Sequence, residues 1–256
     1  GSILPDDNAA QGFDNVGAAL SVSPVLMEAY MQVAEKVSEL ALGNTSVGGD
    51  SATYKVHDEY IQDGRMSEDL PFGTRGGIAV SHFFSLDGEY EIHLKLVRNS
   101  DGWIRGLLDQ KHPLEVRIDG ELIKRFEVGG ESKGLTGPIH SRIGGTEYRF
   151  DEAQLEYEFF GDAGLKVRFP AKAGNHLIQI YFLHRNHSAE GLHEHYAPRI
   201  MPADIRDFKG GEPALSEFTI AGPFEATGPG DTPSRRKILQ CKPGNAADEI
   251  PCARKI

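Results

Sequence analysis

The feature that most limits the fold is a strictly alternating segment, Glu89–Leu96. Apolar and polar side chains take turns in it, in the order Glu89, Tyr90, Glu91, Ile92, His93, Leu94, Lys95 and Leu96. Alternation with a period of two is typical of a β-strand that buries one face and exposes the other to water. The turn dipeptide Asp87-Gly88 precedes the segment, so Phe83-Phe84 is expected to end an earlier strand.

Further apolar segments recur along the chain, each bounded by Gly, Pro or Asp. They are Leu114–Ile118, Leu122–Val128, Leu165–Phe169, His176–Leu183 and Leu215–Ile220. The 30 glycines and 14 prolines fit short strands joined by turns, and no helical pattern is interleaved with the strands. The carboxylates of Asp151, Glu152, Glu156 and Glu158 are interpreted as the solvated face of another strand. The sequence therefore predicts an all-β fold, a jelly-roll-type antiparallel β-sandwich over residues 45–222.

The N-terminal flank, residues 1–44, is predicted to be a loop and one helix that ends a preceding helical domain and packs on the sandwich. Ser23 is a suitable N-cap, and Pro24 takes the first helical position, where its missing N–H has no cost. Gly43 ends the helix. One apolar stripe contains Leu26, Tyr30, Val33, Val37 and Leu40. The stripe predicts a docking face, whose partner is either the sandwich or another domain.

The C-terminal flank, residues 223–256, is predicted to be a linker and the start of a further helical domain. Thr232-Pro233 has the cap-plus-proline pattern of a short helix. The two cysteines, Cys241 and Cys252, either form a disulfide or remain free thiols. No Cys-x-x-Cys-His motif occurs, so this chain is not expected to attach c-type haem. The final residues resemble the first turn of a helix, so the chain is expected to be a piece of something larger.

The net charge of the chain is −11, which argues against two classes of partner. Nucleic acid and an anionic membrane surface both require a basic footprint. No window approaches the ~18 consecutive apolar residues of a membrane-spanning helix. Acidic charge also suits divalent cations, but a solvated surface is the simpler interpretation.

A histidine-rich segment is the first candidate site. Its histidines are His184, His187, His193 and His195, and Glu190 and Glu194 lie among them. Zinc, copper and nickel accept imidazole and carboxylate ligands, so these histidines are candidate metal ligands. Their spacing matches no standard zinc motif, and the alternative is a polar loop without metal.

The turn Asn99–Trp103 is the second candidate, because it contains the chain's single tryptophan. A sugar ring can stack on an exposed aromatic face and hydrogen-bond to polar neighbours, so Trp103 with Asp101 and Arg105 would suit a saccharide. The alternative is that Trp103 folds inward and caps the core. Tyr148 and Tyr196 are weaker aromatic candidates for the same surface.

Calcium and catalysis are the remaining possibilities. Calcium takes six to eight oxygen ligands, and a structural ion held by several turns is a plausible cofactor. The aspartates in or beside turns are Asp50, Asp58, Asp63, Asp87, Asp101, Asp119, Asp151 and Asp162. No Gly-x-Ser-x-Gly elbow occurs, and neither cysteine lies in a recognisable nucleophile setting. An enzyme active site is therefore not expected.

Three segments together resemble one protein family. They are residues 7–30 (DNAAQGFDNVGAALSVSPVLMEAY), 221–238 (AGPFEATGPGDTPSRRKI) and 241–256, which begins at Cys241. This set resembles the planctomycete-type cytochrome c-linked multidomain proteins, exported bacterial proteins that combine domains of unknown function with haem c domains. The central strands match in pattern, and the histidine-rich segment departs from the family.

The resemblance implies a periplasmic or extracellular location, a Cys241–Cys252 disulfide and haem c only in domains outside this chain. In that family the central region is similar to carbohydrate-binding β-sandwich modules, some of them calcium-dependent and xylan-binding. The expected function is thus a non-catalytic module that holds a redox unit near a xylan-like polysaccharide, with neighbouring helical and haem domains as further partners. The alternatives are a structural spacer without ligand and, third, a metal-dependent enzyme that uses the segment His184–His195.

Overall fold

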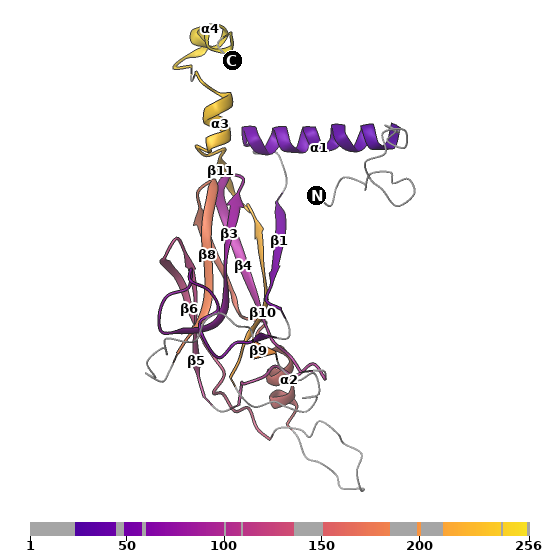
Figure 1. The fold of residues 1–256 in the computed structure, drawn as a ribbon, viewed down its shortest axis with the longest axis vertical. Helices are drawn as coiled ribbons and strands as arrows, with labels where there is room; N and C mark the ends of the chain where they lie inside the picture. Colours follow the sequence, from indigo (N-terminus) through magenta and orange to yellow (C-terminus); the bar gives the residue numbers. More distant parts are fainter. Residues whose placement is uncertain are drawn as a thin grey trace.

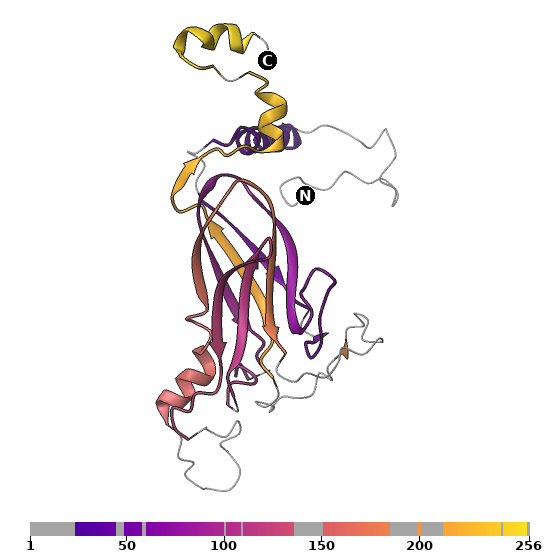
Figure 2. The ribbon, with the colours of Figure 1, turned by 90° about the vertical axis from the view of Figure 1, so that its left-hand side faces the viewer.

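The computed structural model describes residues 24–44, 49–57, 60–99, 101–108, 110–135, 151–184, 199–200, 212–241 and 243–254. Two antiparallel sheets face each other across one apolar core (Figures 1 and 2). The first sheet contains β1 (Asp50–Lys55), β10 (Leu215–Gly222), β4 (Asp87–Leu96), β7 (Lys166–Ala171) and β11 (Ala226–Gly228). The second contains β3 (Thr74–Phe84), β8 (Gly174–Leu183), β5 (His112–Ile118) and β6 (Glu121–Val128). The predicted antiparallel sandwich is confirmed.

Strand β4 lies inside the first sheet, between β10 and β7, as its alternation requires. Tyr90, Ile92, Leu94 and Leu96 are at most 3% exposed. The polar residues of β4 point outward and pair with neighbouring strands: Lys95 contacts Glu217 at 2.7 Å and Glu91 contacts Arg168 at 3.4 Å. Such exposed ion pairs add little stability, typically about 0–1 kcal/mol, so the buried apolar half of the pattern dominates.

The second sheet buries a carboxylate on its outer face. The Glu115 side chain is 1% exposed and accepts hydrogen bonds from Arg117 Nε at 2.9 Å, from Tyr181 Oη at 3.0 Å and from the Arg125 guanidinium. Burial alone would raise the pKa of Glu115, but the hydrogen bonds from Arg125, Arg117 and Tyr181 lower it below its usual value. Burial, reinforced by Glu115, raises the pKa of Tyr181 to about 12.

At one open edge of the sandwich a hydrogen bond joins the two sheets. The hydroxyl of Tyr54 on β1 lies 2.8 Å from Nδ1 of His82 on β3, and the Tyr54 ring stacks on Phe218 at 5.0 Å. His82 is half-buried and pairs across the sheet with His176, whose Nδ1 lies 2.6 Å from a carboxylate oxygen of Asp119.

The environment of His82 predicts a pH-dependent stability. Burial, and then the nearby His176, lower the pKa of His82 below its usual 6.5. The unfolded chain therefore takes up this proton first, and the free energy of unfolding should decrease as the pH falls from about 6.5 towards the folded pKa. Urea unfolding at about pH 7.5 and about pH 5.5 measures this change. The free energy of unfolding should decrease less between the two pH values for His82→Asn than for the wild type. Equal losses would mean that other groups cause the pH dependence.

The prediction of a strand from the alternating carboxylates is wrong, because Glu152–Phe160 forms the helix α2. Its buried side chains, Gln154 and Glu158, are polar and four residues apart, so the helix has no apolar stripe to reveal it. Gln154 Oε1 accepts from Lys133 N at 2.6 Å, and Gln154 Nε2 donates to Glu158 Oε1 at 2.7 Å. These bonds tie the helix to the segment after β6, and Tyr157 packs against the core.

The predicted flanking helices are confirmed as α1 (Pro24–Leu42) and α3 (Pro233–Ile238), and Thr232 Oγ1 accepts from Arg235 N as the cap of α3. Contrary to the prediction for the N-terminal flank, the sandwich does not bury the stripe of α1. Tyr30 is 43% exposed and Val37 is 56% exposed, and no residue of this helix is buried. The C-terminal end of α1 contacts α3, and most of the helix extends past the sandwich (Figure 1).

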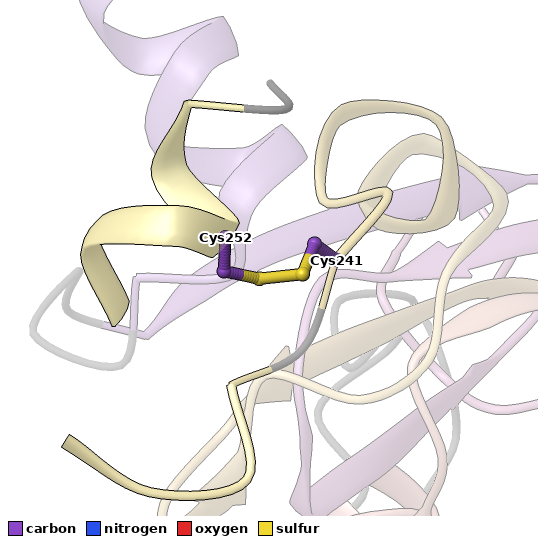
Figure 3. The surroundings of a disulfide bond; sticks show 2 residues. All are labelled: Cys241 and Cys252. Atoms are coloured by element: carbon purple, nitrogen blue, oxygen red, sulfur yellow. A yellow bond between two sulfur atoms is a disulfide. The ribbon is translucent and has the colours of Figure 1, made fainter. Parts of the chain in front are cut away.

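The C-terminal tail contains a short 3₁₀ helix, η1 (Ala246–Asp248), and α4 (Glu249–Ala253). Cys241 and Cys252 form a disulfide with their Cα atoms 5.3 Å apart, which confirms the pairing that the resemblance implied (Figure 3). A disulfide is consistent with an oxidising compartment. No described helix has the length and apolar character needed to cross a membrane.

Candidate functional site

The turn nominated for saccharide stacking lies at the end of the sandwich away from α1 and α3, but its tryptophan is buried. Trp103 is 6% exposed, and its ring packs on Phe159 of α2 with centroids 4.3 Å apart. The prediction of an exposed indole is therefore wrong, and the inward-packed alternative is correct. Asn99 Oδ1 accepts from the Trp103 amide at 3.0 Å, which holds the turn around the ring. Because Phe159 occupies its face, Trp103 has no free surface for a sugar.

The other nominated residues do not form a site with Trp103 in the described part of the chain. Asp101 is exposed, and Arg105 is half-buried with a pKa that burial lowers from its usual value. His184 is exposed at the end of β8, where its amide donates to Gly73 O at 2.9 Å. The remaining candidates lie outside the described residues: Tyr148, His187, His193, His195 and Tyr196. In the described ranges, no three His, Cys, Asp or Glu side chains come together as a metal site.

An open groove lies at the opposite end, where β1 begins and β10 ends. Its volume is about 450 Å³, and its lining residues are Gly49, Asp50, Ser51, Ala221, Gly222, Pro223 and Phe224. We call it the Asp50–Phe224 groove. A smaller cavity of about 150 Å³ shares Gly49 and Asp50 with it and extends to Glu39 and Asn44 at the end of α1.

Backbone geometry explains why the groove forms here. Asp50 pairs with Gly222, so the first residue of β1 and the last of β10 lie side by side. At Gly222 φ is +136°, and a Cβ there would come within 2.7 Å of Tyr90 Cδ1. Only glycine permits this turn, which directs the following residues back across the end of the sheet. The Phe224 amide donates to Glu89 O at 2.8 Å and so fixes the aromatic residue beside β4.

Phe224 lines the groove, and its ring also contacts a cation. Phe224 is 47% exposed and lines the groove, whereas the Arg168 guanidinium carbon, which is not part of the lining, lies 4.3 Å from the ring centroid. Arg168 is itself held by Glu91 at 3.4 Å. The cation–π contact fixes the ring, and the residue remains about half exposed.

The polar side chains among the lining residues of the groove are those of Asp50 and Ser51. Asp50 Oδ1 accepts from the Ser51 amide at 2.8 Å, which orients the carboxylate and leaves its second oxygen for a ligand. The Ser51 hydroxyl can donate or accept. A carboxylate and a hydroxyl beside an aromatic residue can bind a polyhydroxy molecule.

Sequence reasoning missed this site. Asp50 was one of many turn aspartates, and Phe224 was noted only as part of a segment that resembles a family. The available signal was Gly222-Pro223-Phe224 directly after a strand, a break that places an aromatic residue at the end of a sheet.

Fold and groove together define the class, a two-sheet antiparallel β-sandwich module with a surface groove beside its helical flanks. Residues 1–43 match the family model PSD3, described as a protein of unknown function (DUF1587). The match ends at Gly43, the residue that follows α1, and it agrees with the N-terminal part of the resemblance. No curated protein and no solved structure matches the chain.

Proposed function

We propose that the chain is a non-catalytic carbohydrate-binding module and that the Asp50–Phe224 groove holds the sugar. The observation that carries the proposal is Phe224, whose ring Arg168 holds at 4.3 Å and which lines the same groove as Asp50. The aliphatic face of a sugar ring can stack on such an aromatic ring while its hydroxyls bond to the rim. The preferred ligand is a xylan-like polysaccharide.

The arrangement of the flanks favours a binding role over a spacer. A domain that separates its two neighbours has its chain exits far apart. Here α1 and α3 leave from the same end and contact each other (Figures 1 and 2). The Arg235 guanidinium donates to the Leu42 carbonyl at the end of α1, and Gly43 packs so tightly on Pro229 that a Cβ would lie 2.6 Å from its Cβ. The sandwich therefore lies to one side of α1 and α3 and does not separate these two helices.

The setting follows from the resemblance. The disulfide supports an exported protein, in the periplasm or outside the cell. The match of residues 1–43 to a domain of unknown function supports a multidomain parent with helical and haem c domains beyond this chain. In that setting the module would bring a redox unit to a polysaccharide.

Native electrophoresis in gels that contain soluble polysaccharides tests the proposal, with xylan, β-glucan, galactomannan and alginate as the panel. The wild type should be retarded by at least one of these polysaccharides. Phe224→Ala should weaken binding roughly tenfold or more, because one stacked aromatic ring contributes on the order of 1–3 kcal/mol. Asp50→Asn should also weaken binding.

Phe83→Ala is the matched control, because Phe83 is 43% exposed and does not line the groove. It should bind like the wild type. Thermal unfolding of each variant shows whether the fold is retained. Unchanged retardation of a folded Phe224→Ala variant would place the sugar elsewhere, and no retardation of the wild type by any member of the panel would favour the spacer.

A further inference from the structure

A second exposed aromatic residue lies at the other end of the sandwich. Phe72 is 79% exposed, the highest value among the large apolar side chains of the described residues. It precedes Gly73, whose carbonyl accepts from the His184 amide where β8 ends and β3 begins. Strand β3 has 11 residues, so its start near Phe72 and its end near α1 are about 33 Å apart. Phe72 and the Asp50–Phe224 groove are therefore separate surfaces.

The segment that carries Phe72 is firmly held. Leu70 is 2% exposed, and its carbonyl accepts from Arg65 Nη1 at 3.2 Å. The Pro71 carbonyl accepts from Thr74 Oγ1 at 2.6 Å. The Gln179 side chain, on the outer face of β8, donates to the carbonyl of Asp69. An exposed ring on an anchored segment loses little conformational entropy when a ligand stacks on it.

A cation also fixes this ring. The Arg65 guanidinium carbon lies 4.3 Å from the Phe72 centroid, so one face of the ring is covered. With 79% of the residue still exposed, the other face is open to solvent. Phe72 on Arg65 thus repeats the arrangement of Phe224 on Arg168, with the same 4.3 Å separation. We call the pair the Phe72 shelf.

The surroundings of the shelf favour a sugar over a protein partner. A protein hot spot is an aromatic residue inside a patch of apolar contacts. No other exposed large apolar side chain of the described residues lies between Gln62 and Gly77. Two exposed carboxylates, Glu68 and Asp69, precede the ring closely in the chain. Because these two carboxylates outnumber the Arg65 cation, a neutral, hydroxyl-rich sugar suits the exposed ring better than a uronate.

We infer that the Phe72 shelf is a second saccharide-stacking platform for a neutral polysaccharide. This inference rests on the proposed function and extends it, because a module with two separate sugar sites binds a polymer bivalently. One module can then join two polysaccharide chains, or two stretches of one chain, and bind the polymer more tightly than either site alone. Short oligosaccharides gain nothing from the second site.

The test uses soluble xylan and xylobiose with the wild type, Phe72→Ala, Phe224→Ala and the double variant. Light scattering measures the cross-linking of xylan, and calorimetry measures binding. The wild type should raise the scattering of xylan, and each single variant should abolish the rise. Phe72→Ala should bind xylan roughly tenfold more weakly, which corresponds to the loss of one site of a bivalent pair. The double variant should not bind.

Two further variants separate the role of the ring from a loss of fold. Phe72→Tyr retains the aromatic face and should retain the cross-linking of xylan. Phe160→Ala removes another exposed ring, 64% exposed at the end of α2, and should have no effect. If Phe72→Ala cross-links xylan like the wild type, the inference is overturned and a protein becomes the better partner for the ring.

The outcomes for the two sites are distinguishable. Loss of binding in Phe224→Ala with unchanged Phe72→Ala supports the groove and overturns the shelf. If Phe72→Ala loses binding while Phe224→Ala binds like the wild type, the result supports the Phe72 shelf as a sugar site and overturns the groove. A wild type that binds neither xylan nor xylobiose overturns the inference, while the remaining polysaccharides of the panel still test the proposed function.

Discussion

Replacement of Arg75 by methionine is expected to lower the free energy of unfolding by about 2–3 kcal/mol, because a buried donor of several hydrogen bonds is removed. The Arg75 side chain is 2% exposed. Its Nε lies 2.6 Å from a carboxylate oxygen of Glu212, Nη1 donates to Pro213 O at 2.9 Å, and Nη2 lies 3.1 Å from His112 Nδ1. The guanidinium also lies over the Phe182 ring at 4.6 Å.

The position of Arg75 explains the size of the effect. Arg75 belongs to β3 of the second sheet, whereas Glu212 and Pro213 precede β10 of the first sheet. The guanidinium therefore connects the two sheets at the end away from the flanking helices. Methionine fills a similar volume but donates no hydrogen bond, so the Pro213 carbonyl loses a buried donor.

Urea unfolding of Arg75→Met and of Arg236→Met measures this difference. Arg236 is the control because its side chain is 59% exposed and its contact with Asp231 is a surface pair at 3.7 Å. The control should lose about 0–1 kcal/mol. Similar losses in the two variants would show that the buried network contributes no more than a surface ion pair.

Replacement of Gly77 by alanine is expected to lower the free energy of unfolding by about 3 kcal/mol or more, through backbone strain and a direct clash. Gly77 has φ of +79°, which an L-residue adopts only at a cost. A Cβ at this position would lie 1.9 Å from the Ile180 carbonyl oxygen. That oxygen belongs to β8, so the added methyl group must separate β3 from β8 at the register shift between Arg75 and Ile78.

Gly120→Ala is the matched control for this prediction. Gly120 has φ of +82°, almost the value at Gly77, but no heavy atom lies within 4 Å of its added Cβ. Gly120→Ala should lower the free energy of unfolding only through backbone strain, by about 1–2 kcal/mol. The difference between the two unfolding free energies isolates the clash, and equal losses would contradict it.

The strands were largely predictable because their pattern is local. In β4 each buried residue alternates with a polar one, whereas other strands, such as β8, were recognisable as short apolar segments beside turn residues. The cap of α3 was equally readable, since Thr232 accepts from Arg235 N as the cap-plus-proline pattern requires. The helix α2 could not be predicted from the sequence, because its buried residues Gln154 and Glu158 are polar and are held by hydrogen bonds.

The two aromatic surfaces were invisible for a different reason. Trp103 was the obvious candidate in sequence, yet Phe159 covers it from a helix more than fifty residues further along the chain. Phe72 gave no sequence signal and Phe224 gave only the Gly222-Pro223 break before it, and each ring depends on an arginine that the fold brings to it. Exposure of an aromatic side chain is a property of its neighbours in space, which sequence spacing does not encode.

By itself, the sequence determined the antiparallel sandwich, the flanking helices and the acidic character, because these follow from local periodicity, turn residues and composition. Tertiary structure alone decided which aromatic rings face water, that both flanks leave from one end, and that Asp50 meets Gly222 beside a groove. These features depend on contacts between residues that are distant in the chain. Such contacts are set by the packing of the whole core, and no short window of sequence contains them.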